Sequence, residues 1–323
     1  MRQACPGGRA TDKGKHMIIC CGEALIDMLP RELPDGEGAL LPVAGGAVFN
    51  TAIALGRLGA DAGFFSGLST DMFGRLLEET LQKSGVDYSF CVRSGRPTTL
   101  AFVELTDGHA KYTFYDEETA GRMLTPDALP ELDERVEALH FGAISLIPEP
   151  CGSSYEALLA READRRVISL DPNIRANFIP DTEAHRRRIR RMIAESDIVK
   201  VSDEDLAWLE PGRAADAVKA DWLSQGVAII VETMGAQGAV ATTPSGSVPV
   251  DAKQVRVVDT VGAGDSFDAG LLAGLKNAGR LTKPALRSIQ KNDLESALNL
   301  AVSVAAVTVS RAGANPPWKD ELN

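Results

Sequence analysis

The sequence predicts an α/β fold in which helices cover both faces of a mostly parallel central sheet. From residue 17 onward, apolar runs alternate with segments of helical period, an order typical of parallel strands joined by crossover helices. Two segments, 32–43 and 98–121, interrupt this alternation and predict a small separate β-sheet. The length of 323 residues suits one large α/β domain with an insertion, or two modest domains.

The composition is ordinary for a globular protein, with 44% hydrophobic and 24% charged residues. A net charge of −11 argues against a nucleic-acid partner and against an anionic membrane surface. No apolar run approaches the ~20 residues that span a bilayer. Five cysteines without C-x-x-C spacing predict reduced thiols in a cytoplasmic protein. Residues 1–16 lack an apolar signal-peptide core, so we expect a disordered extension.

The predicted core covers residues 17–31, 44–97 and 122–323. Strands are expected where apolar runs stand between turn residues, at 18–26, 62–68, 139–147, 167–170, 197–201 and 227–232. Helices are expected where apolar residues recur at helical period, at 47–58, 73–81, 153–165 and 293–309. Adjacent Cys20 and Cys21 fall in the first strand and should point to opposite faces of the sheet.

The small sheet is predicted from a hairpin at Thr98–Tyr115, where polar and apolar residues alternate on both sides of Asp107-Gly108. Phe114 shares one face of the second arm with Ala110 and Tyr112. A hairpin cannot join a parallel sheet without a crossover, so we place it with segment 32–43. An edge hairpin without a further role is the alternative. Residues 238–250 predict another hairpin.

A glycine-rich turn carries the clearest chemical signal. Gly262 and Gly264 stand between a predicted strand at Val255–Val258 and an apolar segment of helical period. The backbone N–H groups of such a turn converge at a helix N-terminus and favour an anion. Asp265 in the same first turn would repel phosphate, but it can take a proton from a hydroxyl that attacks phosphate. Residues 262–265, with Ala263, therefore predict phosphoryl transfer to an alcohol.

Other interpretations of this turn fit the sequence less well. A dinucleotide-binding fingerprint requires glycine three residues after Gly264, where Phe267 stands. The pattern G-x-x-x-x-G-K-[ST] of P-loop enzymes does not occur in the chain. A purely structural role for Asp265, as a helix cap, is the remaining alternative.

The segment Asp259–Gly270 resembles the signature of the ribokinase-like, or PfkB, carbohydrate kinases. A second signature of that family is matched upstream by Gly45–Ala52, and two signatures in the right order are more specific than one. The resemblance runs from about Met17 to the C-terminus. It implies a ribokinase-like three-layer sandwich with a β-sheet lid over a sugar site, and an ATP-dependent sugar kinase.

The resemblance also implies which residues hold the sugar. Asp27 resembles the carboxylate that grips two sugar hydroxyls, and it follows the first predicted strand, where open α/β sheets place ligand groups. Arg175, in Asp171-Pro172-Asn173-Ile174-Arg175, would approach the substrate and the transferring phosphate. As lone residues, Asn50 would be a helix cap and Arg175 a surface ion pair. The implied substrate-binding residues are Asp27, Gly45, Gly46, Asn50, Phe114, Arg175 and Asp265.

The nucleotide side is implied in the same way. The family's N-x-x-E segment is replaced by Ser202 and by Asp205 or Glu204, which would help to organise Mg²⁺ through water. The implied ATP-binding residues are Ser202, Asp205, Thr233, Gly235, Gly238, Gly262, Gly264 and, near the adenine, Asn299. The monovalent-cation site of some members, which would hold potassium, is resembled by Asp259, Val261 and Gly313.

The lid residues 111–122 look like those of bacterial fructokinases, so fructose is the expected substrate. Members that act on 2-keto-3-deoxygluconate tend to place an arginine near Asp116, whereas the acidic run Asp116-Glu117-Glu118 would repel that substrate's carboxylate. This keto acid is the alternative substrate. A catalytically silent member that binds sugar or nucleotide is an alternative from another class, which the presence of Asp265 opposes. We expect sugar and ATP as partners, and a homodimer through the lid.

Overall fold

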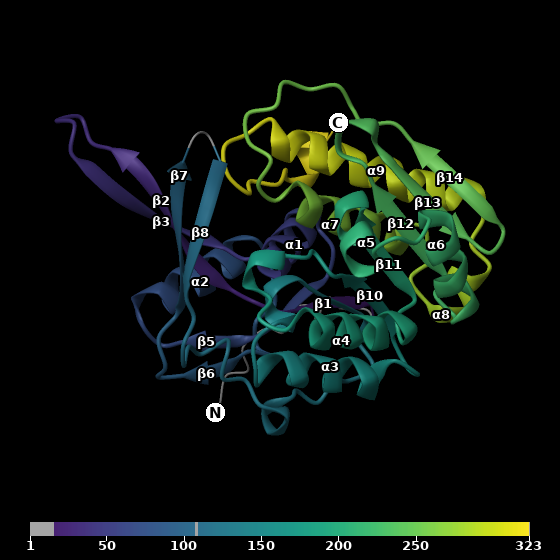
Figure 1. Cartoon of the computed structure of the whole chain (residues 1–323), viewed down its shortest axis with the longest axis horizontal. Helices are drawn as coiled ribbons and strands as arrows, with labels where there is room; N and C mark the ends of the chain where they lie inside the picture. The colour runs from purple at the N-terminus through teal and green to yellow at the C-terminus, as the bar shows by residue number, and fades with distance from the viewer. Residues whose placement is uncertain (1–15, 107–108, 323) are drawn as a thin grey trace, which may run out of the picture.

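An eight-stranded sheet crosses the centre of the structure, a computed structural model that describes residues 16–106 and 109–322 (Figure 1). Its strand order is β14-β13-β12-β11-β10-β9-β1-β4. The strands are β1 (Met17–Cys21), β4 (Ala62–Phe65), β9 (Val136–Gly142), β10 (Val167–Asp171), β11 (Ile198–Ser202), β12 (Ile229–Thr233), β13 (Ala239–Thr243) and β14 (Gly246–Val250). The strands from β12 to β4 in this order are parallel, whereas β13 pairs antiparallel with both β12 and β14 at one edge. The predicted, mostly parallel sheet is confirmed.

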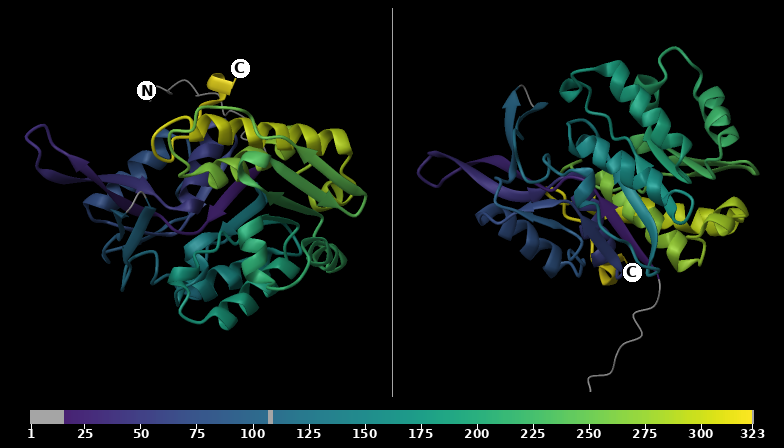
Figure 2. Two further views of the ribbon diagram at one scale, coloured as in Figure 1. Left: turned by 45° about the horizontal axis from the view of Figure 1, so that its top comes forward. Right: turned by 90° about the horizontal axis from the view of Figure 1, so that it is seen from below.

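Helices cover both faces of this sheet and complete three layers (Figures 1 and 2). One face carries α1 (Ala47–Arg57), α7 (Ala263–Asn277) and α9 (Lys291–Val309); the other carries α3 (Cys151–Glu162), α4 (Thr182–Ala194), α5 (Asp203–Leu209) and α6 (Ala215–Ser224). Cys20 and Cys21 enter separate apolar clusters on the two faces, as their alternation predicts. Helices α2 (Met72–Lys83) and α8 (Lys283–Arg287) lie nearer the ends of the sheet.

A four-stranded sheet stands beside the core, in the order β3-β2-β7-β8 (Figure 1). Its strands are β3 (Gly38–Gly45), β2 (Leu25–Glu32), β7 (Thr99–Thr106) and β8 (His109–Tyr115), and a two-stranded piece pairs β5 (Gly67–Ser69) with β6 (Val92–Ser94). The hairpin of β7 and β8 confirms the period-two alternation, but its predicted turn at 107–108 lies outside the described residues, as do residues 1–15. We call the four-stranded sheet the lid.

The strand predicted at 18–26 is wrong, because the chain leaves the central sheet after Cys21 and enters the lid as β2. In the sequence, the end of β1 and the start of β2 form one continuous apolar run. The break between them occurs at Gly22, where a Cβ would lie 2.6 Å from Cγ2 of Val48. Asp27 therefore stands within β2 rather than at the end of the first strand. The boundary placed between residues 31 and 32 falls inside the same lid strand, and the division into domains stays a prediction.

The strand predicted at Val255–Val258 is also wrong, because no strand of the described residues pairs with this segment. Its valines at 255, 257 and 258 are exposed, so β-branched composition alone was misleading. The strand predicted at 139–147 ends at Gly142, where a short 3-10 turn over Ala143–Leu146 follows. Within the described residues, no helix combines the length and the apolar character that crossing a membrane requires.

Candidate active site

A cavity of about 350 Å³ lies between the lid and the N-terminus of α7. It forms where segments far apart in the sequence meet at the carboxyl ends of the parallel strands. Sequence-predicted residues that line it are Asp27, Gly46, Asn50, Phe114, Arg175, Val261, Gly262, Ala263, Gly264 and Asp265. The two predicted signatures, one in α1 and one in α7, are therefore brought to a single site.

Asp265 stands in the first turn of α7 and is only 7% exposed. The side-chain amide of Asn50 donates a hydrogen bond to its Oδ2 at 2.9 Å, and the Thr51 hydroxyl donates to its main-chain oxygen at 3.2 Å. Burial raises the pKa of Asp265 to about 6, against the opposing effect of the Asn50 hydrogen bond. At neutral pH this carboxyl group is ionised yet more basic than an exposed aspartate, which suits a proton acceptor.

Gly262 begins α7 in the left-handed conformation, with φ of 77°. A Cβ at this position would lie 2.7 Å from the Cβ of Ala314, so only glycine fits. A helix leaves the N–H groups of its first turn without partners inside the helix, and the first turn of α7 holds Gly264 and Asp265. The turn can therefore bind an anion beside the carboxylate of Asp265.

The lid brings Asp27 to the opposite side of the cavity. Burial raises the pKa of Asp27 to about 6. A side chain at Gly45 would collide with the Asp27 carboxylate, and Gly46 precedes α1 with φ of 112°. Glycine is therefore required at residue 45 because the chain passes close to Asp27. It is required at residue 46 because other residues rarely adopt this backbone conformation.

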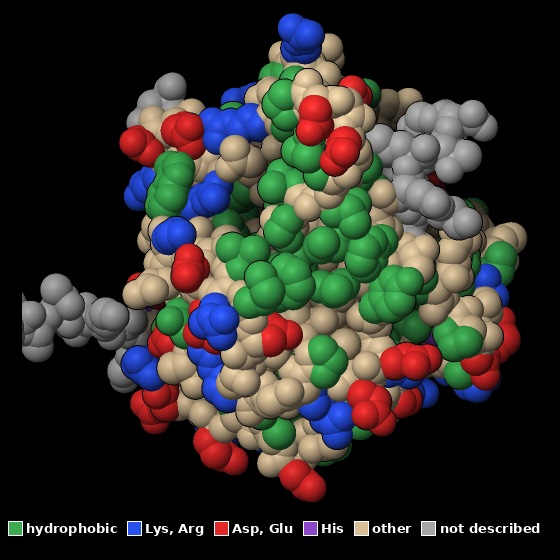
Figure 3. Space-filling view, turned by 90° about the vertical axis from the view of Figure 1, so that its left-hand side faces the viewer, with side chains coloured by type: hydrophobic (Ala, Val, Ile, Leu, Met, Phe, Trp, Pro, Cys, Tyr) green, Lys and Arg blue, Asp and Glu red, His purple; other side chains and the backbone are tan. Residues whose placement is uncertain are grey.

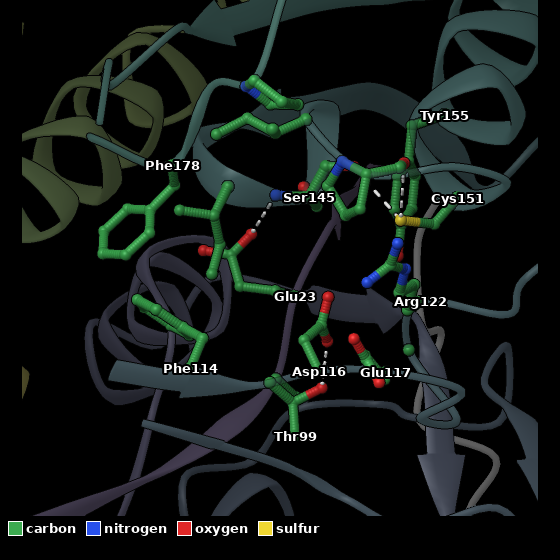
Figure 4. A pocket seen from close by; sticks show the side chains of 16 residues that line it. Glu23, Thr99, Phe114, Asp116, Glu117, Arg122, Ser145, Cys151, Tyr155 and Phe178 are labelled. Carbon is green, nitrogen blue, oxygen red and sulfur yellow. Dashed lines mark hydrogen bonds between the residues drawn. The ribbon is translucent and has the colours of Figure 1, made fainter. Parts of the chain in front are cut away.

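Glu23 is a cavity residue that the sequence analysis missed. One carboxylate oxygen accepts from the N–H of Ala47 at 2.8 Å, and the other accepts from the N–H of Ser145 at 3.3 Å (Figure 4). Burial raises the pKa of Glu23 to about 7, and these N–H donors oppose the rise. Glu23 thus ties the start of α1 to the turn after β9.

A second cavity of about 350 Å³ adjoins the first, and Glu23, Phe114 and Phe178 line both. The rings of Phe114 and Phe178 meet edge to face with centroids 4.6 Å apart, so the lid contacts the core here. Figure 4 shows these two rings on one side, with Asp116, Glu117 and Arg122 on the other. The hydroxyl of Thr99 donates to Asp116 Oδ1 at 2.7 Å. Asp116 and Glu117 of the acidic run therefore line the second cavity.

Lys200 and two carboxylates form a buried group behind the glycine-rich turn, and the sequence analysis missed all three. The Lys200 ammonium donates to Asp171 Oδ2 at 2.8 Å and lies 4.0 Å from Asp268 Oδ2. Although burial acts to lower the pKa of Lys200, the negative charges of Asp171 and Asp268 raise it above its usual value. Lys200 therefore carries a fixed positive charge at the wall of the first cavity.

A further cavity of about 470 Å³ opens on the other side of the turn and shares Thr260, Ala263 and Gly264 with the first. Its polar rim includes the predicted residues Thr233, Gly235 and Gly238, and its apolar walls include Phe267, Val302 and Val309. Gly238 has φ of 93° and passes so close to β14 that a side chain would collide with it. An apolar slot beside an anion-binding turn suits a nucleotide.

Three of the predicted nucleotide residues do not line these cavities. Ser202 accepts from the N–H of Asp205 at 3.0 Å and caps α5. The Asp205 carboxylate is buried and accepts from the N–H of Ile174 at 2.9 Å, whereas Glu204 is exposed. Asn299 is exposed on α9, one turn before Val302. Asp205 thus supports the loop that carries Arg175, and Asn299 stays a prediction.

Arg175 lines the first cavity but is exposed, and its guanidinium donates to the carbonyls of Asn173 at 3.4 Å and Ile174 at 3.1 Å. The predicted cation residues are brought together by Asp259, whose carboxylate accepts from the N–H of Val261 at 3.0 Å and of Gly313 at 2.8 Å. Among the described residues, His, Cys, Asp and Glu form no cluster of three that could hold a metal ion.

Comparison with known proteins identifies the family. The sequence model of the pfkB family carbohydrate kinases matches residues 15–321. A fructokinase from Rhizobium leguminosarum bv. trifolii is 58% identical over 280 residues, which cover 87% of this chain and 86% of that protein. Fructokinase-1 from Zea mays is 36% identical, over 95% of this chain and 96% of the relative.

Solved structures agree with the sequence comparison. The crystal structure of a fructokinase from Xylella fastidiosa with bound ATP has a TM-score of 0.87 and 30% identity, and the match covers 95% of this chain and 96% of that one. A double-mutant fructokinase from Vibrio cholerae O395, in fructose, ADP and potassium ion bound form, has a TM-score of 0.81 and 26% identity, with 93% and 94% covered. The predicted ribokinase-like fold is confirmed, and the chain belongs to the pfkB family of carbohydrate kinases.

Proposed function

We propose that this carbohydrate kinase transfers the γ-phosphate of MgATP to a hydroxyl group of fructose. The observation that carries the proposal is the position of Asp265 at a helix N-terminus, between a sugar-sized cavity and an apolar slot. Its carboxylate is buried and has a raised pKa, so it can accept a proton. The names of the relatives supply the substrate, since the Rhizobium and Zea mays proteins are fructokinases and the Vibrio structure holds fructose and ADP. The bound ATP of the Xylella structure supports the phosphate donor.

On the sugar side, Asp27 accepts hydrogen bonds from two sugar hydroxyls, and the backbone at Gly45 and Gly46 permits the sugar to approach. Asn50 holds the Asp265 carboxylate in place through its amide. Asp265 takes the proton of the attacking primary hydroxyl while the new oxygen–phosphorus bond forms and the bond to the β-phosphate oxygen breaks. Phe114 closes the lid side of the site and helps to exclude water, which limits ATP hydrolysis.

On the phosphate side, the backbone N–H groups of residues 262–265 stabilise charge on the transferring phosphoryl group. Arg175 supplies a further positive charge once its guanidinium turns from the carbonyls of its own loop to the cavity. The rim at Thr233, Gly235 and Gly238 receives the ribose and phosphates, and the apolar slot receives the adenine. Asn299, one turn before Val302 of the slot wall, would lie near the adenine.

The metal ions of the reaction fit the residues present. Mg²⁺ keeps several of its waters and would be held chiefly by the nucleotide phosphates. Ser202 and Asp205, rather than the exposed Glu204, would organise water around it. Potassium would lie beside Asp259, Val261 and Gly313, and the potassium ion of the Vibrio structure supports this site.

A second candidate substrate is 2-keto-3-deoxygluconate, because Arg175 lines the cavity and could pair with a carboxylate. Asp116 and Glu117 at the sugar end oppose it, since they would repel that group. The same site therefore discriminates between the two substrates by charge.

A coupled ADP-release assay with fructose, 2-keto-3-deoxygluconate, ribose, glucose and adenosine tests the proposal. We expect a kcat/KM for fructose at least ~100-fold above that for the other acceptors, a discrimination that buried polar contacts can supply. Parallel assays in potassium and sodium test the cation site. A preference for the keto acid would contradict the fructose assignment, and binding of ATP without turnover of any sugar would favour a catalytically silent protein.

We also propose that two copies of the chain pair through their lids. Figure 3 shows hydrophobic side chains gathered across the face that carries the lid. Leu33, Leu40, Leu41 and Tyr115, on the lid or next to it, are each more than a third exposed. Light scattering should give twice the chain mass, and Leu41→Lys should give a monomer. A wild-type monomer at assay concentrations would contradict the pairing.

A further inference from the structure

The ammonium group of Lys200 lies directly behind the backbone of the glycine-rich turn. Its Nζ atom would be 3.0 Å from a Cβ built at Gly264, so the charge lies directly beside the anion-binding turn. Lys200 comes from β11, Asp171 ends β10, and Asp268 stands one turn after Asp265 on α7. Three elements therefore converge on one buried cation.

The surroundings of this cation are strongly acidic. Asp171, Asp265 and Asp268 are 3%, 7% and 2% exposed, and all three line one small internal space. Like charges at such short range repel strongly when water is excluded. Lys200 is 5% exposed, whereas Arg175, a second cation near Asp265, is exposed. The buried carboxylates thus depend on Lys200 for compensation.

Lys200 affects the pKa values of the two carboxyl groups next to it, Asp171 and Asp268. Burial raises the pKa of Asp268, and the charge of Lys200 opposes that rise. Although burial acts to raise it, the charge of Lys200 lowers the pKa of Asp171, so Asp171 is ionised and forms an ion pair with Lys200. Lys200 and Asp171 therefore compensate each other's charge, and Asp265 shares a small internal space with Asp171.

We propose that Lys200 is a positioning residue of the phosphoryl transfer: it balances the charge of Asp171 behind residues 262–265, so that the turn accepts the γ-phosphate and Asp265 alone acts as base. The inference rests on the proposed function, because it assigns Lys200 to that same site. Lys200 acts through its neighbours, since its ammonium group donates to Asp171 and lies next to Gly264 of the turn.

The chain offers a matched control for a buried lysine that is only structural. Lys219 on α6 is 8% exposed, and its ammonium lies 2.7 Å from Glu232 and 3.1 Å from Asp216. It lines neither the sugar cavity nor the apolar slot. Lys219→Met therefore removes a buried ion pair of similar kind without changing the charge around Asp265.

Binding of MgATP and MgADP, measured by calorimetry, gives the first test. Lys200→Met should weaken MgATP binding about 10- to 100-fold. This loss is smaller than the ~10²- to 10³-fold drop in kcat that follows when a hydrogen-bond donor to the reacting group is removed. The same variant should weaken MgADP binding much less, because MgADP lacks the γ-phosphate. Lys219→Met should leave both affinities unchanged. Equal losses for the two nucleotides in Lys200→Met, or no loss, would overturn the proposal.

The pH dependence of kcat/KM for fructose gives the second test. The charged and titratable side chains that share the cavities of Asp265 are Glu23 and Asp27, His140 of β9, Asp171, Arg175, Lys200 and Asp268. Lys200→Met removes only one of them, so the acidic limb should move up by about one pH unit, while Lys219→Met should leave it in place. An unshifted limb in Lys200→Met would indicate a structural role and overturn the proposal.

A double variant separates charge balance from direct contact and guards against misfolding of the single variant. Lys200→Met with Asp171→Asn removes both members of the ion pair, so the buried charge is balanced again. It should recover most of the MgATP affinity and the wild-type acidic limb. If it stayed as impaired as Lys200→Met, Lys200 would act on the phosphate itself and charge balance would be refuted.

These readouts remain informative if the substrate assignment fails. A wild-type protein that phosphorylated no sugar would refute the proposed function. The difference between MgATP and MgADP binding in Lys200→Met would still confirm or refute the role of Lys200, because it needs no turnover.

Discussion

Asp265 should destabilise the folded chain at neutral pH, so Asp265→Asn is expected to make the protein more stable. Folding transfers this carboxyl group from water to a site where it is 7% exposed, and burial raises its pKa from 3.8 to about 6. The native protein therefore binds a proton more tightly than the unfolded chain does. The stability that this proton contributes is fully present below pH 3.8 and is lost as the pH rises through about 6.

The size of the effect follows from the same values. Each pKa unit corresponds to ~1.4 kcal/mol, so ionised Asp265 costs up to about 3 kcal/mol of unfolding free energy at pH 7.5. Asparagine mimics the protonated group and can still accept the amide hydrogen bond of Asn50. We expect Asp265→Asn to gain most of this energy, which corresponds to a Tm increase of about 4 °C for a chain of this length.

Urea unfolding at pH 7.5 and near pH 4 is the assay. The stability advantage of Asp265→Asn should fall below about 1 kcal/mol near pH 4, because the wild-type carboxyl group is then protonated in the folded state. Asp164→Asn, at an exposed position on the surface, is the control and should change little at either pH. An advantage that is independent of pH, or a less stable variant at pH 7.5, would refute the reasoning.

Three further outcomes are expected at the site. Asp27→Asn should raise the KM for fructose about tenfold or more and leave the KM for MgATP unchanged; equal changes in both would contradict its role in sugar binding. Gly264→Ala should lower kcat/KM for MgATP about tenfold, because its Cβ would press on Lys200 Nζ, whereas Gly95→Ala meets open space and should be neutral. In the wild type, kcat/KM for fructose should fall about tenfold per pH unit below about 6, as Asp265 takes up a proton; a profile that is flat down to pH 5 would exclude Asp265 as base.

Local patterns predicted most of the framework. Alternation placed Cys20 and Cys21 on opposite faces, and the hairpin at 98–115 followed from its period of two. The predictions are wrong where pairing with a distant strand determines the structure. Residues 255–258 have the composition of a strand but pair with no strand of the described residues. The apolar run 18–26 spans two strands that belong to different sheets. This change leaves no periodic trace, because the end of β1 and the start of β2 are both buried.

The candidate site was predictable where glycines and carboxylates cluster in the sequence, and less so elsewhere. Gly262, Gly264 and Asp265 form such a cluster, and the structure places them at one cavity with Asn50. Lys200 interrupts an apolar strand as a single cation, a signal that could have been read as a buried ion pair. Its partners lie on separate elements, so only the folded chain reveals their charge balance.

The most direct test of the account is the rate at which phosphate passes from labelled MgATP to fructose in a single turnover. The wild type should form fructose phosphate and ADP in equal amounts. Asp265→Asn should bind both substrates with little change and transfer the phosphoryl group at least ~100-fold more slowly, because it has lost the general base. Transfer by Asp265→Asn at close to the wild-type rate would contradict the assignment of Asp265 and the mechanism built on it.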